Sequence, residues 1–313
     1  MWDRVTGSNM SLEMQAFHWN EDFENARVFL VEAFQADRPY MNWIPTQLEN
    51  VAFGPCGAEY LDEEDEYIRL WLADDRIAAF TMVKPSGECW VNVHPDHTTH
   101  VKELVEAAEQ QLLQMKTGGE ERPKLEVFVA DPSKELESVL VKRGYSLAGL
   151  EGYIRERAVY SPAPAYTVPE GFIVRNANIE EEFEEYRRVL GSVFGHCANM
   201  TRSLARRYST ASFYNAELDI VAVAPDGHFG AFCTVRVDPS SKITELEPVG
   251  THPNYRRMGL AKAVICEGLK RLKKHSPTNV CIPGAAPTAA ADRLYESLGF
   301  TNTGRINIWQ RAL

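Results

Sequence analysis

Hydrophobic residues recur along the chain with two spacings, one typical of strands and the other typical of helices. Runs of β-branched and aromatic residues predict strands, whereas apolar residues three or four positions apart predict amphipathic helices. In the second half of the chain we expect strands at 171–175, 218–224, 229–237, 242–251, 278–282 and 306–310, and helices at 179–193, 260–274 and 288–298.

The first half predicts elements in a similar order. We expect helices at 21–34, 101–115 and 134–142, and strands at 66–73, 76–83, 89–93, 124–130 and 152–157. A short phrase also recurs: HPDHTTHVKE begins at His94 and HPNYRRMGLA at His252, an offset of 158. Gly144 and Gly299, each of which follows a predicted helix in its own half, form a second matching pair 155 residues apart. These features predict an internal duplication of about 150 residues.

A proline-rich stretch separates the two copies. Residues 158–170 hold three prolines and show little periodicity, which is typical of a linker. We predict one domain over 1–157, this linker over 158–170, and a second domain over 171–313. The fold class is α/β, in the α+β sense that each copy is a mixed sheet covered by helices.

Length and composition support a two-domain globular chain. Its 313 residues exceed the usual size of one core, and 44% hydrophobic with 25% charged residues is ordinary globular composition. We find neither an apolar run of roughly 18 residues, as in a membrane-spanning helix, nor a secretory signal pattern. Six scattered cysteines favour buried thiols in a reducing compartment. We therefore expect a cytoplasmic protein without a membrane partner.

Charge is distributed unevenly between the two halves. The net charge of −11 argues against a nucleic-acid partner, because such binding relies on neutralising phosphates. Residues 161–313 nevertheless hold 18 basic and 15 acidic side chains, whereas the residues before them hold 15 and 29. A small polyanionic ligand should therefore prefer the second half.

A candidate anion site follows the strand at 242–251. The next helix begins there, and its first-turn N–H groups and dipole favour an anion. Gly259 lets the backbone approach a ligand closely, while Arg256 and Arg257 can form charge-assisted bonds with phosphate oxygens. The spacing Arg-x-x-Gly-x-Ala, which ends at Ala261, indicates a pyrophosphate cradle. The alternative is a basic loop before an ordinary helix.

Together with LYESLGF at 294–300, this strand–loop–helix pattern resembles the GNAT superfamily of acyl-CoA-dependent N-acyltransferases over 165–313. Alanine stands at Ala261, where the family more often has glycine. The resemblance implies a GNAT fold and a GNAT-type N-acetyltransferase (EC 2.3.1.-) with acetyl-CoA as co-substrate and no metal. It also implies a coenzyme site made of Val249, Gly250, Thr251, Arg256, Arg257, Met258, Gly259, Leu260 and Ala261.

The resemblance further implies catalytic residues. Tyr295 would protonate the departing thiolate; alternatively, it is a helix tyrosine that packs on the sheet. Glu245 and Glu247 share one face of a strand, so either could accept the amine proton, directly or through water. Glu247 is slightly preferred as the base. Alternatively, the two glutamates are solvated strand carboxylates, or they bind a cationic substrate without accepting a proton. Direct attack fits the family better than an acyl-cysteine, because Cys266 and Cys281 are expected to be buried thiols.

The first copy lacks these groups. At the positions that correspond by the two offsets, the first copy has threonines in place of the two cradle arginines, valine and glutamate in place of the cradle glycine and alanine, and leucine in place of the tyrosine. These residues are Thr98, Thr99, Val101, Glu103 and Leu140. His94, His97 and His100 have a spacing that could bind zinc, but a structural role for His94, matched by His252, is the preferred interpretation.

The resulting hypothesis is a tandem acetyltransferase whose second domain transfers an acetyl group, by direct attack, to an amine of a small molecule or peptide. His196 and Cys197 either contact that acceptor or serve packing. The alternative function is a non-catalytic acyl-CoA-binding sensor or scaffold. We expect either a monomer, as an internal pseudo-dimer, or a homodimer.

Overall fold

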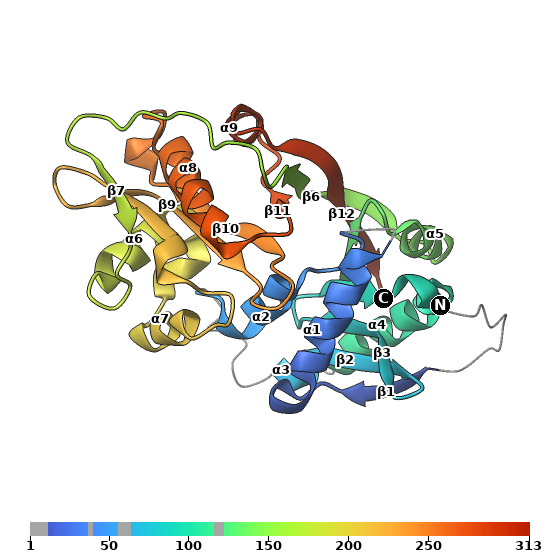
Figure 1. The fold of residues 1–313 in the computed structure, drawn as a ribbon. Helices are drawn as coiled ribbons and strands as arrows, with labels where there is room; N and C mark the ends of the chain where they lie inside the picture. The colour runs from blue at the N-terminus through green and yellow to red at the C-terminus, as the bar shows by residue number, and fades with distance from the viewer. Residues whose placement is uncertain (1–11, 37–39, 56–63, 116–121) are drawn as a thin grey trace. The chain divides into compact units, whose positions relative to one another are not determined.

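The computed structural model describes residues 12–36, 40–55, 64–115 and 122–313. Figure 1 shows its helices and strands, which form two compact units. Unit 1 comprises Met1–Asn42, Glu63–Gly149 and Asn307–Leu313, and unit 2 comprises Trp43–Asp62 and Leu150–Ile306. Strands pair in both parallel and antiparallel fashion, and helices cover them, so the predicted fold class is confirmed.

Unit 1 is built on five strands of the first sequence half. They lie in the order β1 (Glu13–Ala16), β2 (Ile68–Ala73), β3 (Arg76–Val83), β4 (Glu88–Val93) and β5 (Lys124–Ala130). The β4–β5 pair is parallel, and the pairs before it are antiparallel. Its helices are α1 (Trp19–Gln35), α3 (Glu64–Tyr67), α4 (Val101–Met115) and α5 (Lys134–Lys142).

Unit 2 contains the strands and helices of the second sequence half. Its sheet runs in the order β6 (Ser146–Arg157), β11 (Val280–Ala285), β10 (Thr244–Thr251), β9 (Phe229–Val237), β8 (Asp219–Val223) and β7 (Ile173–Asn176). The β10–β11 pair is parallel and the others are antiparallel. Its helices are α6 (Phe183–Val193), α7 (Arg202–Ser209), α8 (Leu260–Leu272) and α9 (Ala289–Ser297).

The two units do not coincide with the two sequence halves. From residue 150 onward β6 belongs to unit 2, where it pairs with β11, and the end of β12 (Thr301–Ala312) belongs to unit 1. Helix α2 (Pro45–Phe53) is also part of unit 2. An exchanged strand covers a sheet edge that would otherwise present unpaired N–H and C=O groups. The predicted boundary at residue 157 divides the strands in sequence order. In the structure, most of β6 and the end of β12 instead belong to the compact unit built mainly from the other sequence half.

Helix α2 has specific partners in unit 2. Its Glu49, which is 3% exposed, accepts hydrogen bonds from the backbone N–H and the hydroxyl of Ser212. The Arg207 guanidinium of α7 lies 5.0 Å from the centre of the Phe53 ring. A helix from the first sequence half therefore fixes the loop that follows α7.

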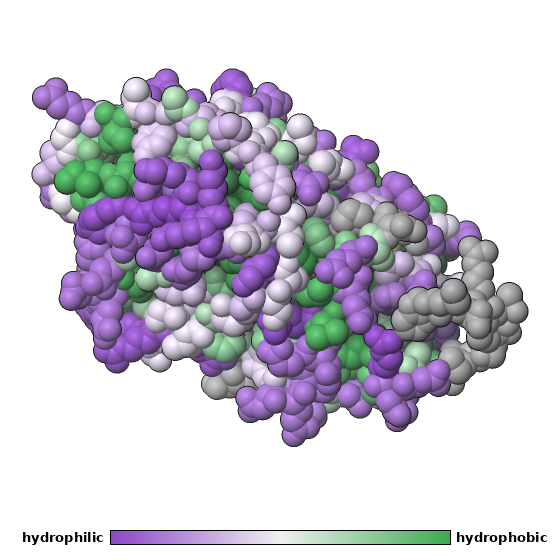
Figure 2. Space-filling view, in the orientation of Figure 1, coloured by the Kyte–Doolittle hydropathy of each residue, from purple (hydrophilic) through white to green (hydrophobic). Residues whose placement is uncertain are grey.

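Two hydrophobic cores cover the two faces of the unit 2 sheet. One contains α8 residues such as Leu260 and Val264 together with Val235 and Leu246. The other contains residues of α6 and α7, among them Tyr186, together with Phe232 of β9. Figure 2 shows hydrophilic residues gathered over α6 and α7. No helix in the described part of the chain is both long and apolar enough to cross a membrane.

Candidate active site

The loop before α8 presents backbone N–H groups to solvent. Gly259 is the N-cap of this helix and adopts a left-handed conformation with φ 80°, and Arg257 also has a positive φ of 64°. No side chain caps the first turn, so its N–H groups and the helix dipole remain available to an anion. A Cβ at Gly259 would meet nothing within 4 Å, which leaves this position open to a ligand.

Two arginines place positive charge at the same loop. Arg256 and Arg257 are both exposed. The Arg256 Nε donates one long hydrogen bond, 3.5 Å, to the Thr251 carbonyl oxygen. Among the described residues, neither guanidinium has a carboxylate partner within ion-pair distance. Both charges can therefore serve a phosphate group.

The strand before this loop separates from its parallel neighbour. β10 and β11 share one registered pair, Glu245 opposite Cys281. A bulge between Leu246 and Val249 shifts the register of β10 on β9, and Pro248 within it has no N–H to donate. Residues Val249–Thr251 then pair with β9 on one side only within the described sheet. Their free edge can accept an extended ligand as an added strand.

Glu247 lies at this bulge. Its side chain is accessible to solvent, but protein atoms crowd the carboxyl and displace part of its hydration. This desolvation raises the pKa of Glu247 to about 7; the Arg236 guanidinium opposes the shift and the Glu245 carboxylate adds to it. An accessible carboxyl with a pKa near neutrality suits a general base.

Glu245 has different surroundings although it shares the same side of β10. It is 1% exposed, and its Oε1 lies 3.3 Å from Arg236 Nη1 in an ion pair with that equally buried arginine. The Arg236 guanidinium also lies 4.7 Å from the centre of the Phe213 ring. The structure thus brings Glu245 and Glu247 together around Arg236, which the sequence analysis missed. An arginine in the otherwise apolar stretch FGAFCTVRV was the available signal.

Tyr295 lies on α9, facing the sheet. It is 7% exposed, and its ring makes an edge contact with Phe300 at 5.9 Å. Burial raises the pKa of the Tyr295 phenol, the Cys233 thiol and the Glu247 carboxyl raise it further, and Arg155 opposes them. The phenol is therefore protonated at neutral pH and can act as a proton donor. Because Glu247 affects Tyr295, the candidate base and the candidate acid share one electrostatic environment.

The cysteines correct part of the sequence analysis. Cys233, Cys266 and Cys281 are buried free thiols, as is Cys89 in unit 1, so the prediction for Cys266 and Cys281 is confirmed. Burial raises the pKa of the Cys233 and Cys266 thiols, which makes thiolate formation unfavourable. Cys197, however, is disulfide-bonded, so the expectation of a free thiol is wrong there. Cys56 itself lies outside the described residues.

The first copy carries the corresponding turn without the anion-binding groups. His94 accepts a hydrogen bond from the Asp96 N–H at 3.3 Å, and His252 accepts one from the Asn254 N–H at 3.2 Å. The shared structural role predicted for these two histidines is therefore confirmed. Within the described ranges, no three His, Cys, Asp or Glu side chains are grouped so that they could hold a metal ion.

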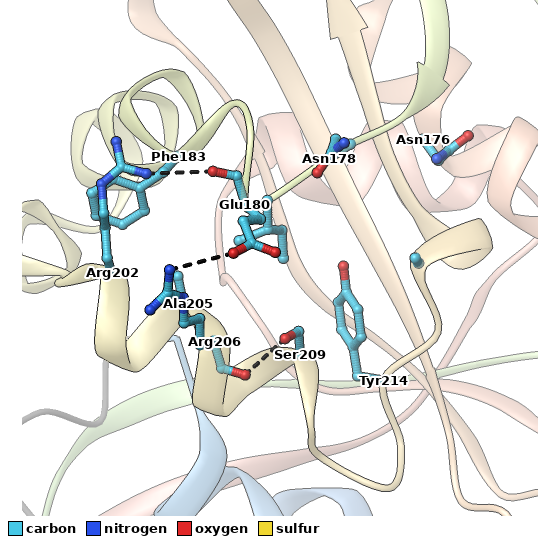
Figure 3. Close-up of a pocket in the computed structure, with 12 residues that line it drawn as sticks. Asn176, Asn178, Glu180, Phe183, Arg202, Ala205, Arg206, Ser209 and Tyr214 are labelled. Carbon is cyan, nitrogen blue, oxygen red and sulfur yellow. Dashed lines mark hydrogen bonds and ion pairs between the residues drawn. The ribbon is translucent and has the colours of Figure 1, made fainter.

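A cavity of about 370 Å³ lies beside α6 and α7 (Figure 3). Arg206 forms an ion pair with Glu180 at its wall, and the Arg202 guanidinium lies 4.6 Å from the centre of the Phe183 ring. None of the predicted site residues lines this cavity. Tyr214 is at its edge, and its hydroxyl donates to buried Asp219, which is not part of the candidate active site. We therefore build the active site at β10 and α8 rather than in this cavity.

Comparisons with known proteins agree with this geometry. Residues 179–300 match the model of the acetyltransferase (GNAT) family. This match covers the segment that holds the predicted cradle and the helix of Tyr295. Its two units resemble a solved tandem GNAT protein from the clavulanic acid biosynthesis pathway, with a TM-score of 0.68, 14% identity, and coverage of 96% of this chain and 98% of that one.

Two further relatives are informative. A GCN5-related N-acetyltransferase from Sphaerobacter thermophilus shares the fold with a TM-score of 0.67, 17% identity, and coverage of 96% of this chain and 95% of its own. A mycothiol acetyltransferase from Thermomonospora curvata is 30% identical over 168 residues, which are 50% of this chain and 56% of that protein. The chain spans about half the length of the curated relatives it matches.

Proposed function

We propose that this protein is an N-acetyltransferase whose unit 2 binds acetyl-CoA and transfers the acetyl group to an amine of a small molecule or peptide. The observation that carries the proposal is the convergence of Glu247 and Tyr295 beside the strand that leads into the Arg256–Ala261 loop. The acetyl-CoA pyrophosphate would bind the first-turn N–H groups of α8, with Arg256 and Arg257 beside it. The pantetheine arm would lie along the free edge of Val249–Thr251.

Direct attack follows from the properties of the candidate residues. Ionised Glu247 accepts a proton from the attacking amine, directly or through water, and the nitrogen forms a bond with the thioester carbon. The carbon–sulfur bond then breaks, and the sulfur takes its proton from the Tyr295 phenol. A covalent acyl-cysteine is not favoured, because the nearby thiol of Cys233 is buried and protonated.

Glu245 receives a supporting role in this proposal. Its carboxylate already forms an ion pair with Arg236 in a buried setting, so proton uptake there would leave Arg236 without its counter-charge. Within this pair, the Arg236 guanidinium limits the rise of the Glu247 pKa. Glu247 is therefore the proposed base, and Glu245 orients Arg236.

The experiment follows thiol release from acetyl-CoA over a panel of amines, including aminoglycosides, amino acids and the acceptor of the mycothiol acetyltransferases. Wild-type chain should release thiol with at least one amine, and Tyr295→Phe should lower kcat about 100-fold while retaining affinity for acetyl-CoA. Binding without turnover on any amine would instead favour the non-catalytic acyl-CoA sensor. Equal turnover by wild type and Tyr295→Phe would contradict the acid role.

A further inference from the structure

Arg155 belongs to the first sequence half but lies in unit 2, near the candidate acid. It is a residue of β6 and pairs in register with Ile282 of β11. Its exposed fraction is 2%. A guanidinium buried to this degree needs compensating partners, so the groups around it indicate what it does.

Those groups come from the helix that carries Tyr295. The Arg155 Nη2 forms an ion pair with Asp292 of α9, and the guanidinium carbon lies 5.8 Å from the centre of the Tyr295 ring. Asp292 and Tyr295 are three residues apart and are therefore neighbours on the helix surface. The same guanidinium lies 5.6 Å from the centre of the Tyr153 ring. Arg155 is thus held by α9 and set against its tyrosine.

The guanidinium also retains one hydrogen-bond donor. The Arg155 Nε is buried and has no acceptor among the described residues, which is unusual for a buried polar group. The titratable groups that act on the Tyr295 phenol are Cys233 of β9, Glu247 of β10 and Arg155 of β6. Arg155 is the cation in this set, and it alone favours loss of the phenol proton.

We propose that Arg155 is a positioning residue for Tyr295, which fixes α9 through Asp292 and stabilises the charge that develops on the phenol oxygen. This inference rests on the proposed function. When the carbon–sulfur bond of the tetrahedral intermediate breaks, its electron pair passes to sulfur, and the phenol proton follows. The phenolate that remains regains a proton from solvent. A fixed cation beside that phenolate lowers the free energy of the transfer.

Arg157 provides a matched control on the same strand. It is two residues from Arg155, so both side chains lie on one face of β6, and it is 4% exposed. The Arg157 Nε donates to the Leu298 carbonyl oxygen at 2.8 Å, at the end of α9, and its Nη2 donates to the Pro162 carbonyl oxygen at 2.6 Å. Replacing Arg157 therefore removes support from the same helix without removing the charge next to Tyr295.

The test replaces Tyr295 in the full chain with a polyfluorinated tyrosine, whose stronger phenol ionises below the pH range of the other tyrosines. Its ionisation is followed by absorbance in the protein without ligand. In Arg155→Met the phenolate should appear about one pH unit higher than in the parent chain. Arg155→Lys, which keeps the charge, should restore most of the difference, and Arg157→Met should titrate like the parent.

Several results would overturn the proposal. One is identical titration of Arg155→Met and the parent; another is an equal shift in Arg157→Met, which would indicate loss of packing alone. If Arg155→Met does not fold, Arg155→Gln replaces it with the same expectations, because glutamine can still bond with Asp292. The titration does not need turnover. An inactive wild-type chain would therefore refute the proposed function, while the titration would still decide whether Arg155 acts on the Tyr295 phenol.

Discussion

At the residue scale, the proposed proton transfer rests on a difference between two carboxylates that lie two positions apart on β10. Glu247 is accessible and has a pKa of about 7 because desolvation disfavours its charged form. Glu245 is buried and paired with Arg236. Glu247 can gain and lose a proton near neutral pH, whereas Glu245 remains in its ion pair with Arg236.

Glu247 should control the pH dependence of acetyl transfer. A base works in its ionised form, so kcat/KM of the wild type should rise as pH increases through about 7 and then level off. Glu247→Gln should lose this rise and reduce the rate roughly 100-fold or more. Thiol release measured from about pH 5.5 to about pH 9 checks both effects. A Glu247→Gln variant with the wild-type profile would remove Glu247 from the mechanism.

Glu245→Gln is the matched control and should affect stability instead. Without the carboxylate, Arg236 would be a buried charge without its counter-charge, which should lower the free energy of unfolding by about 3 kcal/mol. Urea unfolding followed by fluorescence measures this loss. The pH dependence of transfer should still show its rise in the folded variant, shifted to lower pH because the Glu245 carboxylate no longer raises the Glu247 pKa. A stable Glu245→Gln that lost this rise would instead make Glu245 the base.

At the element scale, the proposed coenzyme site depends on the start of α8. Gly259 has a φ of 80° and open space where a Cβ would be. Gly144, behind α5 in unit 1, has a φ of 83° and equally open space. Substitution at either glycine therefore introduces a similar backbone strain, roughly 1–2 kcal/mol. The two positions differ in whether a ligand is expected beside them.

Gly259→Glu should weaken acetyl-CoA binding at least tenfold, because it adds a carboxylate where phosphate is expected. Gly144→Glu should cause a similar loss of stability and leave the affinity unchanged. Isothermal titration of acetyl-CoA into each variant measures the affinity, and thermal unfolding measures the strain. Equal affinities for Gly259→Glu and wild type would remove the α8 loop from the coenzyme site.

The sequence predicted elements well where periodicity was long. The helix expected at 260–274 is α8, and the strand expected at 242–251 is close to β10. It missed α2 and α7, of 9 and 8 residues, because such short helices show little periodicity. It also identified strands without showing which sheet edge each joins. Arg155 and Arg236 consequently escaped notice, because their partners are set by strand register and strand exchange.

At the scale of the whole molecule, the first copy contributes structure to the unit that is expected to catalyse. Unit 2 takes α2 and most of β6 from the first sequence half. β6 pairs with β11, and two of its arginines hold α9. The loss of cradle groups in the first copy is therefore compatible with a supporting role for that copy.

A fragment of residues 158–313 should not fold independently. It lacks β6, so the β11 edge would be unpaired, and Arg155 and Arg157 would be absent from α9. Circular dichroism and fluorescence should show an unfolded or aggregated fragment, and co-expression with residues 1–157 should recover a complex with native spectra. A cooperative unfolding transition of the isolated fragment, equal in stability to the full chain, would contradict the structural exchange.

The central claim is that the second copy alone holds the coenzyme. Isothermal titration of acetyl-CoA into the full chain tests it most directly, with Arg257→Glu compared with Thr99→Glu at the corresponding exposed position of the first copy. We predict one coenzyme per chain, at least tenfold weaker binding in Arg257→Glu, and unchanged binding in Thr99→Glu. Two coenzymes per chain, or equal weakening by both substitutions, would contradict the account.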